Sequence, residues 1–337
     1  MTIELVYSTE KKDWLTEAVA RWEATNPTAG GRPIKVTLTG MGSQAIVNGL
    51  RDGTLKPAAI SPASTLQITQ VNAASINGKQ DIAADSQPLV FTPLVIVEVK
   101  DTVADSLKTG ASLWNMVHDL TVEPDRSKNL LFGQTSPMLS NSGLQTWLLM
   151  AYSYHQKTRG LTAADINDPD FQKWLGEYAK NVVKFGDSTS AFMRDMILGA
   201  PSLYRAGTVY ESTAIENIPL AKNRLVDLQV IYPPANLWSD HPFAILNDDS
   251  WVSAEQRDAA KQLRDFLLRP EQQQEAVGFG FRPSDPNVAI NGADSPFVKY
   301  ADQGIKTNIG ELVEDPNAEV IQALLDTWNR LQGNVSK

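Results

Sequence analysis

The N-terminal part of the chain repeats one unit three times: a short apolar strand, a polar loop and a helix with one apolar side. The strands are expected at residues 3–7, 34–39 and 58–60, and each loop is rich in Ser, Thr, Gly or Pro. Consecutive units of this kind predict a parallel sheet with right-handed crossovers. Because ligands of such sheets bind at the carboxyl ends of the strands, the loops are the places to look for function.

Two apolar stretches interrupt this pattern. Residues 88–98 are rich in β-branched side chains and contain two prolines. Residues 232–246 have a double proline near their start. We expect both stretches to cross between two lobes and to form a two-strand hinge. Lobe 1 then comprises residues 1–90 and 243–337, with a last helix near 317–331 packed back on it. Lobe 2 comprises residues 91–242 and repeats the same plan with a second sheet.

The loop 140–143 combines the features expected of a ligand-binding helix start. Ser140, Asn141 and Ser142 are all favourable N-cap residues before an apolar helix, and Gly143 would let a ligand approach the backbone. The start of a helix offers N–H groups at the positive end of its dipole, which suits an anion or a polar ligand. Plain capping is the alternative for any one of these loops.

Loops of the same kind recur along the chain, and together they favour binding over capping. Neutral donors at several strand ends suit a desolvated ligand held by many hydrogen bonds. The candidate ligand-binding residues are Ser8, Thr9, Glu10, Gly42, Ser43, Gln44, Ser61, Ser140, Asn141, Ser142, Gly143, Ser188, Thr189, Tyr210, Glu211 and Trp238. No catalytic and no metal-binding residue is predicted, and no cofactor is expected.

Composition and motifs narrow the function classes. Lys and Arg number 30 against 39 Asp and Glu, a net charge of −9 without charged blocks, which argues against nucleic acid as a partner. There is no cysteine, so thiol chemistry and thiolate metal sites are excluded, and no apolar run is long enough to be a transmembrane segment. Residues 40–45 match a dinucleotide-binding fingerprint but lack the acidic residue expected after the next strand.

The remaining titratable candidates favour structural roles. His118 and His155 lie near the ends of predicted helices, and His241 stands before a proline in the predicted crossing to lobe 1. The pair Asp248-Asp249 is more typical of a turn than of a metal site.

The last third of the chain carries the most specific family signal. Tyr232-Pro233-Pro234, the run 238–246, the run 267–274 and Gly280-Phe281-Arg282-Pro283 are similar to the type II periplasmic solute-binding proteins of ABC transporters, close to the molybdate, sulfate and iron binders. The resemblance covers nearly the whole chain. It implies an α/β fold of two lobes, each a mainly parallel sheet flanked by helices, and loops 8–9, 42–43 and 140–143 match the family's ligand contacts.

The resemblance implies a non-enzymatic, monomeric protein that closes its lobes on a small polar or anionic solute. An oxyanion or a small carboxylate is favoured, because no arginine stands at a site loop and Tyr210 lacks the adjacent tyrosine of ferric binders. A sugar or a cation remains an alternative ligand, because Trp238 and Glu211 could face one. The expected partner is an ABC-transporter permease; the expected location is extracytoplasmic, with a signal or lipoprotein leader removed. A surface sensory or adhesion module without transport is the alternative, and an enzyme comes third.

Overall fold

The fold is described from a computed structural model, which covers residues 1–100, 107, 110 and 112–335. The chain divides into two compact units. Unit 1 consists of Met1–Thr92 and Ser239–Phe297, and unit 2 consists of Pro93–Trp238 and Val298–Lys337. Each unit is therefore built from two separate stretches of chain. The predicted α/β fold class is confirmed, and the action of the connecting strands as a hinge stays a prediction.

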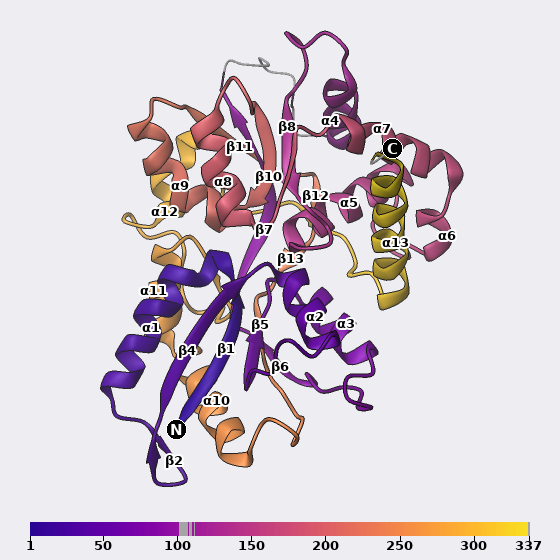
Figure 1. The fold of residues 1–337 in the computed structure, drawn as a ribbon. Coiled ribbons are helices and arrows are strands. Elements are labelled where there is room, and N and C mark those ends of the chain that lie inside the picture. The colour runs from indigo at the N-terminus through magenta and orange to yellow at the C-terminus, as the bar shows by residue number, and fades with distance from the viewer. Residues whose placement is uncertain (101–106, 108–109, 111, 336–337) are drawn as a thin grey trace. The chain divides into compact units, whose positions relative to one another are not determined.

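Unit 1 is organised around a five-stranded sheet in the order β4 (Lys35–Met41), β1 (Thr2–Ser8), β5 (Ala59–Ser61), β14 (Pro242–Ile245) and β6 (Asp85–Pro88). The predicted parallel part is present, since β1 pairs in parallel with β4 and with β5 (Figure 1). The strand β14 returns antiparallel to both β5 and β6.

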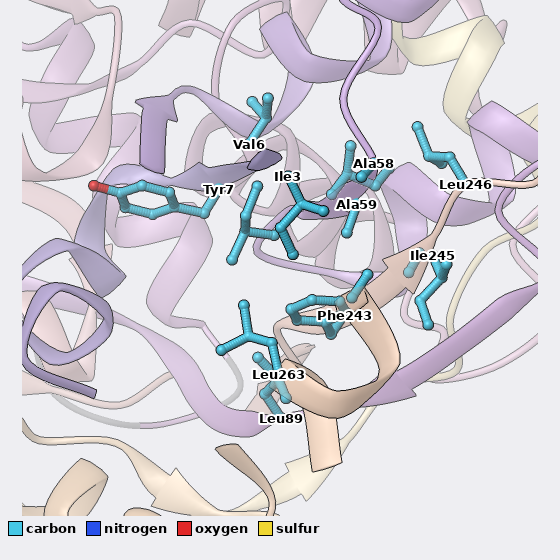
Figure 2. Close-up of a cluster of buried hydrophobic side chains, with 14 of the residues drawn as sticks. Ile3, Val6, Tyr7, Ala58, Ala59, Leu89, Phe243, Ile245, Leu246 and Leu263 are labelled. Carbon is cyan, nitrogen blue, oxygen red and sulfur yellow. The ribbon is translucent and has the colours of Figure 1, made fainter. Parts of the chain in front are cut away.

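The helices of unit 1 start where the strands end. The 3-10 turn η1 (Thr9–Lys11) and α1 (Lys12–Ala24) follow β1, α2 (Ser43–Arg51) follows β4, and α3 (Thr65–Ala73) follows β5. The later helices α10 (Ala254–Leu267) and α11 (Pro270–Gly278) contact α1, and a small hairpin joins β2 (Thr28–Ala29) to β3 (Arg32–Pro33). The strand β15 (Arg282–Pro283) pairs with the first residues of β7 (Val90–Val99). Val6, Ala59 and Phe243 are among the buried core residues (Figure 2).

Unit 2 has its own sheet in the order β11 (Leu228–Ile231), β7, β10 (Ala206–Tyr210), β8 (Phe132–Thr135) and β9 (Lys184–Gly186). The strand β8 is parallel to β10 and to β9, whereas β7 is antiparallel to β10 and β11. Shorter elements are β12 (Ala235–Asn236), paired with β16 (Glu311–Leu312), then β13 (Trp238–Ser239), α12 (Pro296–Lys299) and η2 (Ala301–Gln303).

Three helices of unit 2 again follow its strands. The helices of this unit are α4 (Leu113–Val122), α5 (Asn141–Tyr154), α6 (Ala163–Ile166), α7 (Pro169–Asn181), α8 (Thr189–Gly199), α9 (Glu211–Asn223) and α13 (Ala318–Val335). Helix α5 starts after β8, α8 after β9 and α9 after β10. Parallel strands with this connectivity bring the three helix starts to one edge of the sheet.

The position of the C-terminal helix corrects one prediction. Residues 298–337 belong to unit 2 and not to the lobe that contains the N-terminus. Helix α13 packs against α6 and α7, and the ring centroids of Trp328 and Trp147 lie 5.1 Å apart. The apolar side of the helix was visible in the sequence. Its partner was not, because an amphipathic pattern does not identify the surface that covers it.

Candidate functional site

In unit 1, three predicted loops meet at the carboxyl edge of the parallel strands. Ser8 ends β1, Ser43 begins the helix after β4, and Ser61 ends β5. The side chain of Ser43 accepts a hydrogen bond from the backbone N–H of Ala63 at 2.9 Å, which joins two of these loops. Ser61 is fully buried, and its hydroxyl has no hydrogen-bond partner among the described residues. The sheet thus brings the predicted binding loops to one edge, and the bond between Ser43 and Ala63 links two of them.

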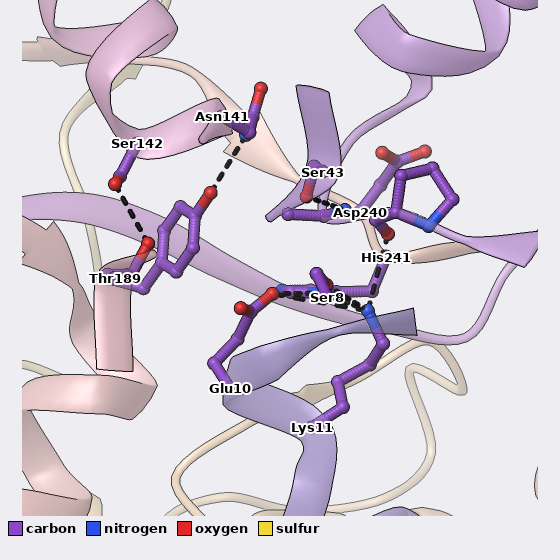
Figure 3. A network of polar contacts seen from close by, with 12 residues as sticks. Ser8, Glu10, Lys11, Ser43, Asn141, Ser142, Thr189, Asp240 and His241 are labelled. Atoms are coloured by element: carbon purple, nitrogen blue, oxygen red, sulfur yellow. Dashed lines mark hydrogen bonds and ion pairs between the residues drawn. The ribbon is translucent and has the colours of Figure 1, made fainter. Parts of the chain in front are cut away.

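The centre of this edge is a buried lysine that the sequence did not indicate. Lys11 is 0% exposed, and its Nζ donates to Ser8 Oγ at 2.5 Å, to the carbonyl of Pro62 at 3.3 Å and to His241 Nδ1 at 2.9 Å (Figure 3). Glu10 Oε1 lies 4.0 Å from Nζ and 3.3 Å from His241 Nδ1. We call Ser8, Glu10, Lys11 and His241 the unit 1 cluster.

Burial decides the protonation states in this cluster. It lowers the pKa of Lys11 to about 8, while Glu10 and Asp240 act in the opposite direction. Burial and the nearby Lys11 charge hold the pKa of His241 well below its usual range. At neutral pH the lysine is therefore an ammonium ion, and the imidazole is neutral with Nδ1 as the acceptor.

The segment that contributes His241 is held by contacts on both sides. Burial raises the pKa of Asp240, against the effect of hydrogen bonds from the backbone N–H and hydroxyl of Thr65. His241 has a φ of 42°, a left-handed conformation that is uncommon for a residue with a side chain. Such strain persists only where surrounding contacts determine the conformation, and here they direct the imidazole to Lys11.

In unit 2, the corresponding edge is made of neutral hydroxyl groups. Ser142 Oγ lies 2.8 Å from Thr189 Oγ1 (Figure 3) and 2.7 Å from Thr135 Oγ1. Ser140 Oγ lies 3.3 Å from both Ser142 Oγ and Thr189 Oγ1. All four side chains are buried. We call these four residues the unit 2 cluster. Each hydroxyl can rotate to donate or to accept, so the cluster can redirect protons toward a ligand.

The other predicted residues of unit 2 surround this cluster with fixed contacts. Asn141 Nδ2 donates to the Tyr210 hydroxyl at 3.1 Å. Glu211 is fully buried at the first turn of α9 and accepts a short hydrogen bond from the Tyr232 hydroxyl. The position of this carboxylate at a helix start is favourable, because it lies at the positive end of the dipole. Trp238 is half-buried, and its carbonyl accepts from Gln145 Nε2 at 3.0 Å.

Capping does not account for the hydroxyls at these strand ends. Ser140 and Ser188 occupy N-cap positions of α5 and α8, yet neither side chain caps its helix. Elsewhere the same residue types do cap: Thr162 and Ser253 form complete capping boxes at α6 and α10. Because an N-cap hydroxyl ordinarily bonds to the first turn, its different orientation at α5 and α8 needs another explanation.

Two predicted residues have structural explanations. A side chain on Gly143 would place its Cβ 2.1 Å from the carbonyl oxygen of Thr135, so this glycine lets α5 pack against the end of β8. The expectation that Gly143 also lets a ligand approach the backbone stays a prediction. Gln44 is fully buried and exchanges amide hydrogen bonds with Gln70, at 2.7 and 3.1 Å, which links α2 to α3.

The remaining predicted residues lie at the edges of the two clusters. Gly42 is the N-cap of α2, while Thr9 and Ser188 are half-buried beside Ser8 and Thr189. Sequence reasoning missed Lys11 and favoured a structural role for His241. The one available signal for Lys11 was its position three residues after the serine at the end of β1.

Among the residues that the structure describes, there is no group of three or more His, Cys, Asp or Glu placed to hold a metal ion. Within those residues, too, the structure contains no helix with the length and apolar character needed to cross a membrane.

Each of the two α/β units carries a buried polar cluster at the ends of its strands. The family model of the bacterial extracellular solute-binding proteins matches residues 3–282. The chain belongs to this family. It is thus a member of a family of extracellular binding proteins, as its sequence predicted. Among curated protein sequences, none matches the chain significantly.

Solved structures share the fold at low sequence identity. The sulfate-binding protein SubI from Mycobacterium tuberculosis H37Rv is 18% identical, with a TM-score of 0.63 and 99% of each chain covered. The substrate-binding protein of an ABC transporter from Agrobacterium tumefaciens is 14% identical, with a TM-score of 0.63 over 98% of this chain and 94% of that one. The periplasmic binding protein AfuA from Actinobacillus pleuropneumoniae is 14% identical, with a TM-score of 0.62 over 99% and 97%.

Proposed function

We propose that this solute-binding protein holds a small anionic solute, an oxyanion or a small carboxylate, and delivers it to an ABC-transporter permease. The observation that carries the proposal is the set of buried hydroxyls at the strand ends of unit 2, where Ser140 stands at the N-cap of α5 without capping it. Family membership supports solute binding, and the similarity to a sulfate-binding protein and to the substrate-binding protein of an ABC transporter supports the solute class and the partner. Closure of the two lobes on the solute stays a prediction.

The chemistry of the clusters favours an anion over a cation. Ser and Thr hydroxyls and backbone N–H groups donate to anionic oxygens, and such charge-assisted hydrogen bonds are stronger than neutral ones. The single carboxylate in the unit 2 candidates, Glu211, already accepts from Tyr232. The proposed ligand contacts are Ser8 and Ser43 in unit 1 and Ser140, Ser142 and Thr189 in unit 2. We also propose that the protein transforms no substrate and acts outside the cytoplasm after removal of a leader.

A thermal-shift screen followed by calorimetry tests the solute. The probes are sulfate, molybdate, succinate, glucose and ferric citrate, and an anion is expected to raise the melting temperature. Ser142→Ala and Ser8→Ala should each weaken binding by about tenfold, the loss expected for one hydrogen bond to a charged group. Ser253→Ala is the matched control, because this serine caps α10 and should affect stability without affecting affinity.

The result can contradict the proposal at two levels. If no probe stabilises the wild-type protein, or if glucose alone does, the anionic solute is wrong. Transport is tested separately with a purified permease from the same source, whose ATPase activity should rise with the loaded protein. Solute binding without that response would favour the sensory or adhesion alternative.

A further inference from the structure

The hydrogen-bond directions around Lys11 fix the proton of Ser8. An ammonium group has three protons to donate, and the three acceptors within reach are Ser8 Oγ, the Pro62 carbonyl and His241 Nδ1. Lysine nitrogen in this state cannot accept. Ser8 Oγ therefore receives a proton from Lys11, and its own hydroxyl proton points to something else.

The structure shows no protein acceptor for that proton within the described chain. The bond from Lys11 is the hydrogen bond that Ser8 Oγ makes there, although the side chain is only 1% exposed. A buried hydroxyl proton without an acceptor is costly, so a ligand oxygen at this strand end would complete the arrangement. Unit 1 thus presents a donor with a fixed direction, where the unit 2 cluster presents hydroxyls that can rotate.

We propose that Lys11 is a specificity-determining residue of the solute site, because its ammonium group makes Ser8 an obligate donor and thereby selects a solute with an unprotonated anionic oxygen. This inference rests on the proposed function and names the group that sets its solute class. Lys11 acts through Ser8, so it is a positioning residue.

The charges around Lys11 define how this selection works. Glu10 Oε1 at 4.0 Å offsets much of the lysine charge, and Asp240 also acts on Lys11 from the β13–β14 connection. His241 is neutral. The cluster therefore selects by the direction of one proton more than by excess positive charge. Above the lysine pKa of about 8, the neutral amine can accept from Ser8, and the fixed donor is lost.

A Ser–Lys catalytic pair is the alternative use of the same two residues. A general base must be unprotonated at the operating pH and free to accept the serine proton. Here the lysine is protonated at neutral pH and its three protons have acceptors. The geometry favours a fixed donor for binding over an activated nucleophile.

The test is calorimetry with sodium sulfate, sodium molybdate and sodium succinate, none of which changes protonation between pH 7 and pH 9.5. Lys11→Met keeps the volume of the buried side chain and should weaken binding by about tenfold at pH 7. Lys12→Met removes the same charge one residue further along, where the side chain is exposed, and should leave the affinity unchanged. In the wild type, affinity should fall by about tenfold from pH 7 to pH 9.5, and Lys11→Met should abolish this dependence.

The outcomes separate this inference from the proposed function. No binding of any probe by the wild-type protein counts against the proposed function. Binding that is equal in Lys11→Met and the wild type, with the same flat pH profile in both, overturns the role of Lys11 alone. If Lys11→Met does not fold, the wild-type pH profile still decides, because a purely structural lysine would not make affinity follow its protonation.

Discussion

The two polar clusters solve the same physical problem with different groups. Both consist of buried side chains at the carboxyl ends of strands, where desolvated polar atoms need partners. Unit 1 uses ionisable residues, Lys11, Glu10 and His241, whereas unit 2 uses neutral hydroxyls. Burial lowers the pKa values of Lys11 and His241, whereas the hydroxyls of unit 2 carry no charge that burial could disfavour. Because of this difference, we expect the stability contributed by unit 1 to depend on pH and the stability contributed by the unit 2 hydroxyls not to.

The largest expected effect is alkaline stabilisation through unit 1. The pKa of Lys11 falls from its ordinary 10.5 to about 8 on folding. Between these values the unfolded chain binds the proton more tightly, so the free energy of unfolding rises with pH, by about 3 kcal/mol in total. Urea unfolding of wild type and Lys11→Met from pH 7.5 to 10 should show this rise in the wild type alone. If the free energy of unfolding has the same pH dependence in both proteins, Lys11 does not make unit 1 sensitive to pH.

A second, smaller effect should come from the packing that supports unit 2. Gly143→Ala puts a methyl group against the Thr135 carbonyl oxygen. Overpacking of about 3 kcal/mol, less about 1 kcal/mol of helix propensity, should lower the free energy of unfolding by about 2 kcal/mol. Gly278→Ala in α11 is the control, since nothing lies within 4 Å of its added Cβ. Equal stability of both variants would contradict the close approach of α5 to β8.

The smallest effect concerns the hydroxyls themselves. Thr189→Val keeps the shape of the side chain but removes its contacts with Ser140 and Ser142, and it should cost about 1 kcal/mol. Thr189→Ser keeps the hydroxyl and should cost less. Thermal unfolding at pH 6 and pH 9 should give the same loss at both values, because no ionisable group takes part. A loss that changes with pH would mean that unit 2 is coupled to a charge.

The sequence predicted the repeated plan better than the chemistry of its strand ends. Alternating strands and amphipathic helices identified β1, β4 and β5 and the helices after them, since these patterns are local. Ser8, Ser142 and Thr189 could be named as candidates because hydroxyls that follow a strand are visible in the sequence. Lys11 was missed because burial of a lysine depends on acceptors supplied by distant residues, here Pro62 and His241. The partner of α13 was missed for the same reason.

The placement of α13 in unit 2 has a consequence for the order in which the chain can mature. Unit 1 has all its residues once synthesis has passed Phe297, whereas unit 2 still needs Val298–Lys337. The last segment supplies Trp328, which packs on Trp147 of α5. During vectorial synthesis or export, a chain that still lacks its last segment should therefore leave this side of α5 uncovered. The indole ring of Trp147 should then be accessible to chaperones and proteases until α13 docks.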